Sequence, residues 1–261
     1  MLSSLEIIQV GFLASLFAGL GTGIGALGVF AVRRLSNRLE DNLLSSAAGV
    51  MLAASFLSLL LPGVEFASAQ YASGAVAVFV VSVGFMSGAV ALYLVHRFAP
   101  HEHFLVGREG PEDTTLSRIW LFVIAITLHN FPEGMAVGVG FAGGDIENGR
   151  SLALGILFQN LPEGLAVAIS LLVIGYSRLR AYTVAFLTGL VEPVGGLVGS
   201  ALVTLAQPLI PWTLGFAAGA MIFVISDEVI PETHRGAHQH LATFSLMAGV
   251  VVMLLLDAVT G

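Results

Sequence analysis

Two nearly identical hexapeptides carry the side chains in this sequence that are best suited to chemistry. "HNFPEG" occupies residues 129–134 and "QNLPEG" occupies residues 159–164, and each lies inside a long apolar run. In each hexapeptide the first residue and the glutamate are four residues apart, so both fall on one helix face about one turn from each other. The repeat predicts two helices that carry matching polar groups: His129 with Glu133, and Gln159 with Glu163.

The glutamates predict a site for a cation. Glu133, Glu163 and Glu192 each lie close to the centre of a predicted membrane span, where an ionised carboxylate costs several kcal/mol unless it is paired or hydrated. All ten basic residues are arginines, and every one lies at a predicted helix end or in a loop. Either these acids are protonated, or the balancing cation comes from outside the chain, and the neighbouring side chains favour a cation. An imidazole nitrogen together with carboxylate and amide oxygens suits a divalent transition metal such as zinc.

Three prolines accompany these acids. Pro132 and Pro162 have no N–H, so each leaves the carbonyl four residues earlier without its helical donor, and Pro193 directly follows Glu192. Irregular backbone at membrane depth is tolerated where protein or a watery cavity satisfies it. A repeated, proline-interrupted segment at the midplane is typical of a transporter binding site, and it predicts kinked helices around Pro132 and Pro162.

The composition indicates an all-α integral membrane protein. Hydrophobic residues make up 56% of the 261 residues and charged residues only 10%, whereas soluble domains average about 25% charged. The chain has no cysteine, which excludes disulfides and thiolate metal sites. It also has no basic patch that would indicate nucleic-acid binding. A span needs about 20 apolar residues. The sequence predicts a single polytopic domain, 1–261, with spans at about 7–32, 43–63, 74–95, 119–141, 151–175, 181–205, 211–230 and 241–259.

Arginine placement predicts the orientation, because cytoplasmic loops collect positive charge. With the N-terminus outside, nine of the ten arginines fall on the inner side, and only Arg150 lies outside. Both termini are therefore expected outside the cytoplasm. The glycine-rich stretches, such as "GLGTGIGALG" and "GGLVGS", favour close helix packing over a direct functional role.

The two hexapeptides resemble the fourth- and fifth-helix signatures of the ZIP (Zrt-, Irt-like protein) metal transporters, in their bacterial branch. The resemblance covers essentially the whole chain, including "EPVGG" in the sixth span and "DEVIPETHR" at the end of the seventh. It implies transport of divalent metal, chiefly zinc, toward the cytoplasm across a bacterial inner membrane. Cadmium, iron and manganese stay open as substrates. It also implies an elevator-like or rocking motion of a helix bundle.

Carried over residue by residue, the resemblance implies a two-metal site. One position would use His129, Glu133, Gln159 and Glu163, with Met51 nearby; a second would use Asn130, Glu133, Asn160, Glu163 and Glu192. Many relatives have His at the place of Gln159, which leaves the metal preference open. No cofactor is expected. The expected partners are divalent metal ions and the lipid bilayer, with a homodimer as the candidate assembly.

Further polar residues are candidates for the two ends of a path. Glu65 follows the second span at its outer end, where it could attract cations or simply be solvated. A weak exit site on the cytoplasmic side could use a larger set: His101, His103, Asp227, Glu228, Glu232, His234 and His238. Loop histidines are also frequently just solvated.

Other classes of function remain alternatives. A membrane-embedded metalloenzyme, such as an intramembrane hydrolase, would be expected to show H-E-x-x-H, whereas His129 and Glu133 give H-x-x-x-E. The other two alternatives are a metal exporter and a scaffold with a structural metal. A metal exporter usually carries a soluble metal-binding domain, and the three midplane acids argue against a scaffold.

Overall fold

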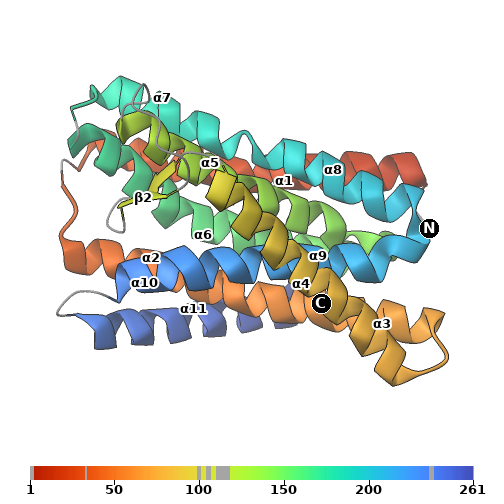
Figure 1. The fold of residues 1–261 in the computed structure, drawn as a ribbon. Helices are drawn as coiled ribbons and strands as arrows, with labels where there is room; N and C mark the ends of the chain where they lie inside the picture. Colours follow the sequence, from red (N-terminus) through yellow and green to blue (C-terminus); the bar gives the residue numbers. More distant parts are fainter. Residues whose placement is uncertain are drawn as a thin grey trace.

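The computed structural model describes residues 3–32, 34–98, 101–103, 107–109, 118–173, 175–234 and 238–260. The chain forms a bundle of long, roughly parallel and antiparallel helices (Figure 1). Its α-helices are α1 Ser4–Ala26, α2 Asn37–Ala54, α3 Leu61–Gln70, α4 Gly74–Phe98, α5 Arg118–Gly140, α6 Ile146–Val173, α7 Arg178–Gly189, α8 Glu192–Leu205, α9 Ile210–Val224, α10 Ile230–Thr233 and α11 Gln239–Thr260. Shorter helical turns extend or join them: η1 Leu27–Phe30, η2 Ser55–Leu60, η3 Ala142–Gly144, η4 Gln207–Leu209 and η5 Ile225–Val229.

The predicted spans correspond to observed helices. Within the described ranges, seven helical stretches are long and apolar enough to cross a membrane. The remaining predicted span, 119–141, is α5. The second stretch, Asn37–Gln70, is longer than the predicted 43–63 because α2, η2 and α3 follow one another without a loop. The protein is thus a multi-pass membrane protein. The long polar connection after α4 contains two short antiparallel strands that the sequence did not predict, β1 His101–His103 and β2 Gly107–Glu109.

The prolines act differently in the different spans. α5 continues through Pro132 and α6 continues through Pro162, so the expected kinks stay a prediction. The sixth span instead breaks into α7 and α8 at Leu190 and Val191, and Pro193 lies in the first turn of α8. A proline is well tolerated there, since the first turn of a helix has no intrahelical acceptor for its N–H groups. The break places Glu192 at the first position of α8.

Two spans contain a widened, π-helical turn shortly before a proline. η2 ends two residues before Pro62, and η5 ends two residues before Pro231. A proline cannot donate to the carbonyl four residues earlier, and a π turn is a known local accommodation inside an otherwise α-helical segment. These widened turns change which side chains of the second and seventh spans face the interior.

The helices fall into two groups that share one apolar core. α1, α5, α6, α7 and α8 pack mainly on one another, while α2, α3, α4, α9 and α11 form the other group. In Figure 1 the first group lies above the second, with α4 crossing in front. We call one end of the bundle the Ser36 end, where α2, α7 and α11 begin, and the other the Gly143 end, where α1 begins and α5 finishes.

Candidate metal site

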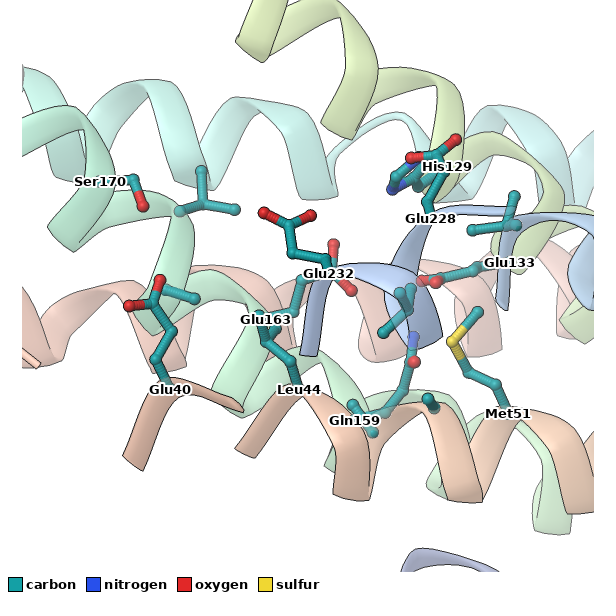
Figure 2. A pocket seen from close by; sticks show the side chains of 16 residues that line it. Glu40, Leu44, Met51, His129, Glu133, Gln159, Glu163, Ser170, Glu228 and Glu232 are labelled. Atoms are coloured by element: carbon teal, nitrogen blue, oxygen red, sulfur yellow. The ribbon is translucent and has the colours of Figure 1, made fainter. Parts of the chain in front are cut away.

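A cavity of about 90 Å³ lies between the two helix groups. It is lined at its inner part by Met51, His129, Glu133, Gln159 and Glu163, which come from α2, α5 and α6. From there it extends toward the Ser36 end of the bundle (Figure 2). The structure therefore brings together the five residues of one of the two positions that the resemblance implied.

His129 has a partner from the opposite helix group. Its Nε2 forms an ion-pair contact with Oε2 of Glu228, which lies in the widened turn η5. The side chains are 12% and 3% exposed, so the pair is almost fully removed from solvent. Glu228 was expected in an exit site at the cytoplasmic side, but the structure places it beside His129 in the same cavity.

The remaining predicted ligands lie next to this cavity but do not line it. Asn160 is fully buried and donates from Nδ2 to Oε1 of Glu192 at 2.7 Å and to the Ala18 carbonyl at 2.9 Å. Its Oδ1 accepts a hydrogen bond from Nε2 of Gln159 at 2.9 Å. This chain connects the cavity residue Gln159 to Glu192 at the start of α8, and Asn130 is buried on α5.

Several polar atoms of this region are buried without a hydrogen-bond partner in the described part of the chain. They are Oε2 of Glu133, Oε1 of Glu163, Oε2 of Glu192 and both amide atoms of Asn130. Buried polar atoms are almost always paired with protein, water or an ion. Among the described residues, however, no three His, Asp or Glu side chains form a ready-made metal-binding group. The coordination shell of a metal bound here would be completed by amide or thioether ligands, or by a rearrangement of the side chains.

The glycine that ends each hexapeptide allows close approach of a neighbouring helix. A Cβ at Gly134 would overlap the Glu192 carbonyl oxygen, and a Cβ at Gly164 would overlap the Thr22 carbonyl oxygen. These glycines therefore let α5 pack directly against α8, and α6 against α1. The same tight packing is seen at Gly138 and Gly19, so the expectation of a packing role for the glycine-rich stretches is confirmed.

The residues predicted for the path ends lie in different places. Glu232 lines the cavity, Asp227 is exposed, and His234 has ring contacts with Thr233, Thr243 and the Ile230 carbonyl. His238 is exposed beyond η5 and α10. His101 and His103 belong to β1, and their side chains lie outside the described residues. Glu65 is exposed on α3, and its role at an entrance stays a prediction.

Two polar cavity residues were missed from the sequence. Glu40 and Ser170 line the cavity toward the Ser36 end, opposite Met51 and Glu133 (Figure 2). Helical spacing could have indicated Glu40, because it lies eleven residues, or about three turns, before Met51 on the same helix face. Glu228 was not assigned to the centre because a regular helical pattern does not reveal η5.

Comparisons with known proteins identify the family. Residues 108–257 match the family described as ZIP zinc transporter. The chain belongs to the ZIP zinc transporter family. It is 46% identical over 251 residues to the zinc transporter GufA of Myxococcus xanthus, covering 96% of this chain and 99% of that protein. It is 47% identical over 240 residues to the zinc transporter ZIPB of Bordetella bronchiseptica, covering 92% and 78%.

The likeness extends beyond bacteria. The human zinc transporter ZIP11 is 35% identical in an alignment 321 positions long, which includes 92% of this chain and 94% of that protein. ZIP proteins are transporters rather than enzymes, so family membership argues against the metalloenzyme alternative. The signatures that suggested the family, "HNFPEG" and "QNLPEG", both lie within the matched residues.

Proposed function

We propose that this ZIP protein moves zinc across the membrane toward the cytoplasm, and that the cargo binds in the cavity beside His129. The observation that carries the proposal is the cavity lining: an imidazole, two carboxylates, an amide and a thioether meet there from three helices. A nitrogen donor with carboxylate oxygens favours zinc over magnesium and calcium, which prefer shells of oxygen alone. The names of the bacterial relatives support zinc as the cargo.

The ligands fall into two positions with shared carboxylates. The first uses His129, Glu133, Gln159 and Glu163, with Met51 nearby. The second uses Asn130, Asn160 and Glu192, with Glu133 and Glu163 bridging the two positions. The unpartnered buried oxygens of Glu133, Glu163 and Glu192 support this arrangement, because a divalent cation would satisfy all three.

Glu228 takes part in the transport cycle through His129. Its carboxylate contacts Nε2 of His129, so the two side chains lie within reach of the same cation. Glu40 and Glu232, farther along the cavity, then face the departing cation.

The motion that we propose is an elevator-like displacement of one helix group against the other, with α5 and α6 bending at Pro132 and Pro162. The cavity lies between the groups, and its described lining extends toward the Ser36 end, while glycine contacts hold α5 close to α8. With both termini outside, the Ser36 end faces the cytoplasm. The described arrangement would then be the one that releases metal inward.

The test is zinc flux in vesicles that contain only this protein and lipid. Glu163→Gln keeps the side-chain volume but removes a carboxylate from both positions, so we expect zinc flux to fall by roughly 100-fold or more. Glu147→Gln, at an exposed position near the start of the same helix, is the matched control and should transport normally. Normal flux in a well-inserted Glu163→Gln protein would contradict the two-position site. If magnesium competed for transport as effectively as zinc, His129 would not be a ligand of the cargo.

A further inference from the structure

Asn148 joins the two helix groups at the Gly143 end of the bundle. Its side-chain Nδ2 donates to the Ser58 carbonyl at 3.0 Å and to the Gly140 carbonyl at 2.9 Å. Ser58 belongs to η2 in the second span, Gly140 is the last residue of α5, and Asn148 itself lies in the first turn of α6. One amide thus links one helix group to both helices that carry the hexapeptides.

Neither carbonyl accepts an ordinary α-helical hydrogen bond from the fourth residue after it. The residue four positions after Ser58 is Pro62, which has no N–H to give, and Gly140 lies at a helix end where carbonyls are left without intrahelical partners. An Asn side chain has two N–H donors on one nitrogen, so it can satisfy both acceptors at once. The backbone N–H of Asn148 in turn donates to Oδ1 of Asp145 at 3.0 Å, which fixes the start of α6.

The link lies on the closed side of the cavity. The cavity extends from Met51 toward the Ser36 end, whereas Ser58 is two turns beyond Met51 toward the Gly143 end. Any movement that opens a path from the Gly143 end to the site must separate η2 from α5 and α6. Such a movement breaks at least one of the two hydrogen bonds of Asn148.

We infer that Asn148 is a positioning residue for transport, a latch that holds the Gly143 end closed while the cavity is open at the Ser36 end. The inference rests on the proposed alternating access of the site. It assigns to a single amide the task of joining the Ser58 carbonyl in η2 to the Gly140 carbonyl at the end of α5. Losing this amide should favour the arrangement in which the Gly143 end is open.

A buried reporter can measure that opening. Ala54 is fully buried in the apolar cluster that also contains Ala136 of α5, and it lies just beyond Met51 toward the Gly143 end. The chain has no cysteine, so Ala54→Cys provides a single thiol whose reaction with a maleimide reports exposure. We expect Asn148→Ala to raise the labelling rate of this thiol in the purified protein by roughly tenfold, the scale expected for the loss of one or two hydrogen bonds.

Asn148→Asp is the sharper variant. It keeps the shape of the side chain but replaces the donor by an acceptor that faces two carbonyl oxygens, so it should raise the rate at least as much as Asn148→Ala. Glu147→Ala, an exposed neighbour in the same helical turn, should leave the rate unchanged. General loosening is measured with a second reporter, Ala185→Cys, which is fully buried within the other helix group and should not respond.

Pro62→Ala tests the physical reason for the latch. It supplies an N–H four residues after Ser58, which competes with Asn148 for the Ser58 carbonyl. Asn148→Ala should then increase labelling less in the Pro62→Ala background than in the parent. An effect of the same size in both backgrounds would remove Pro62 from the argument.

The outcomes separate the latch from the proposed function. Equal labelling of Ala54→Cys in the parent, Asn148→Ala and Asn148→Asp would overturn the latch, as would a matching rise at Ala185→Cys. Zinc flux measured on the same proteins tests transport by itself. A parent that carries no zinc would contradict the proposed function, while the labelling rates would still decide whether Asn148 holds this end closed.

Discussion

The His129–Glu228 pair shows how a single contact can prepare a site for a cation. A carboxylate and an imidazole buried together stabilise each other only while both are present, and removing one partner leaves a costly buried charge. Glu133 and Glu163 line the same cavity, so a cation bound beside His129 would meet their carboxylates as well. The contact with Glu228 offsets part of the cost of burying His129.

Gln159 is the residue at which metal preference should be adjustable. It lines the cavity through α6 and donates to Asn160, so it contributes an amide to the lining. Gln159→His adds a second nitrogen ligand, which favours zinc and cadmium over manganese. We expect the zinc-to-manganese ratio in competitive flux to rise by about tenfold, the equivalent of ~1.4 kcal/mol. An unchanged ratio would show that residue 159 does not contact the cargo.

At the scale of elements, the glycine of each hexapeptide matters as much as its glutamate. Gly134 brings α5 against the first turn of α8, and this contact sets Glu192 beside the residues of α5 and α6. The Asn160–Glu192 hydrogen bond of 2.7 Å depends on the same approach. Helix spacing, and not only ligand identity, therefore defines the second metal position that we propose.

Gly134→Ala should disturb that spacing. The added Cβ overlaps the Glu192 backbone, which cannot move aside as a flexible side chain could, and overpacking of this kind costs roughly 1–3 kcal/mol. We expect a lower melting temperature of the purified protein and reduced zinc flux. Gly74→Ala is the matched control, because a Cβ there meets nothing within 4 Å. Equal behaviour of the two variants would show that the α5–α8 contact tolerates expansion.

At the scale of the whole molecule, the cavity makes the two ends of the bundle different. It extends toward the Ser36 end, near Glu40 and Glu232, whereas Asn148 joins the two helix groups toward the Gly143 end. The arginine count predicts that the Ser36 end faces the cytoplasm. Together these features predict an inward-facing arrangement.

Two exposed positions can decide the orientation. Ser73 lies in the turn between α3 and α4 at the Gly143 end, and Asn37 begins α2 at the Ser36 end. In intact cells, an impermeant thiol reagent should modify Ser73→Cys and spare Asn37→Cys, because only the first faces outside. The cysteine-free background leaves no competing thiol. The reverse pattern would invert the topology and make the described cavity outward-facing.

The sequence by itself determined the class of protein and most of its elements. Apolar length set the spans, because a helix must satisfy its own backbone across a bilayer, and the observed helices follow the predicted ranges. The hexapeptides also identified the family, because their ligands lie at helical spacing within one short segment. His129 with Glu133 and Gln159 with Glu163 could be paired from sequence for that reason.

Only the tertiary structure decided which distant residues meet. Glu228 reaches His129 from a separate helix through the widened turn η5, and Asn148 reaches Ser58 across ninety residues of chain. Helical periodicity describes one helix at a time and contains no information on which faces of two helices come together. A π turn further shifts the register after it, so the side chains that face the cavity depend on packing that no local pattern records.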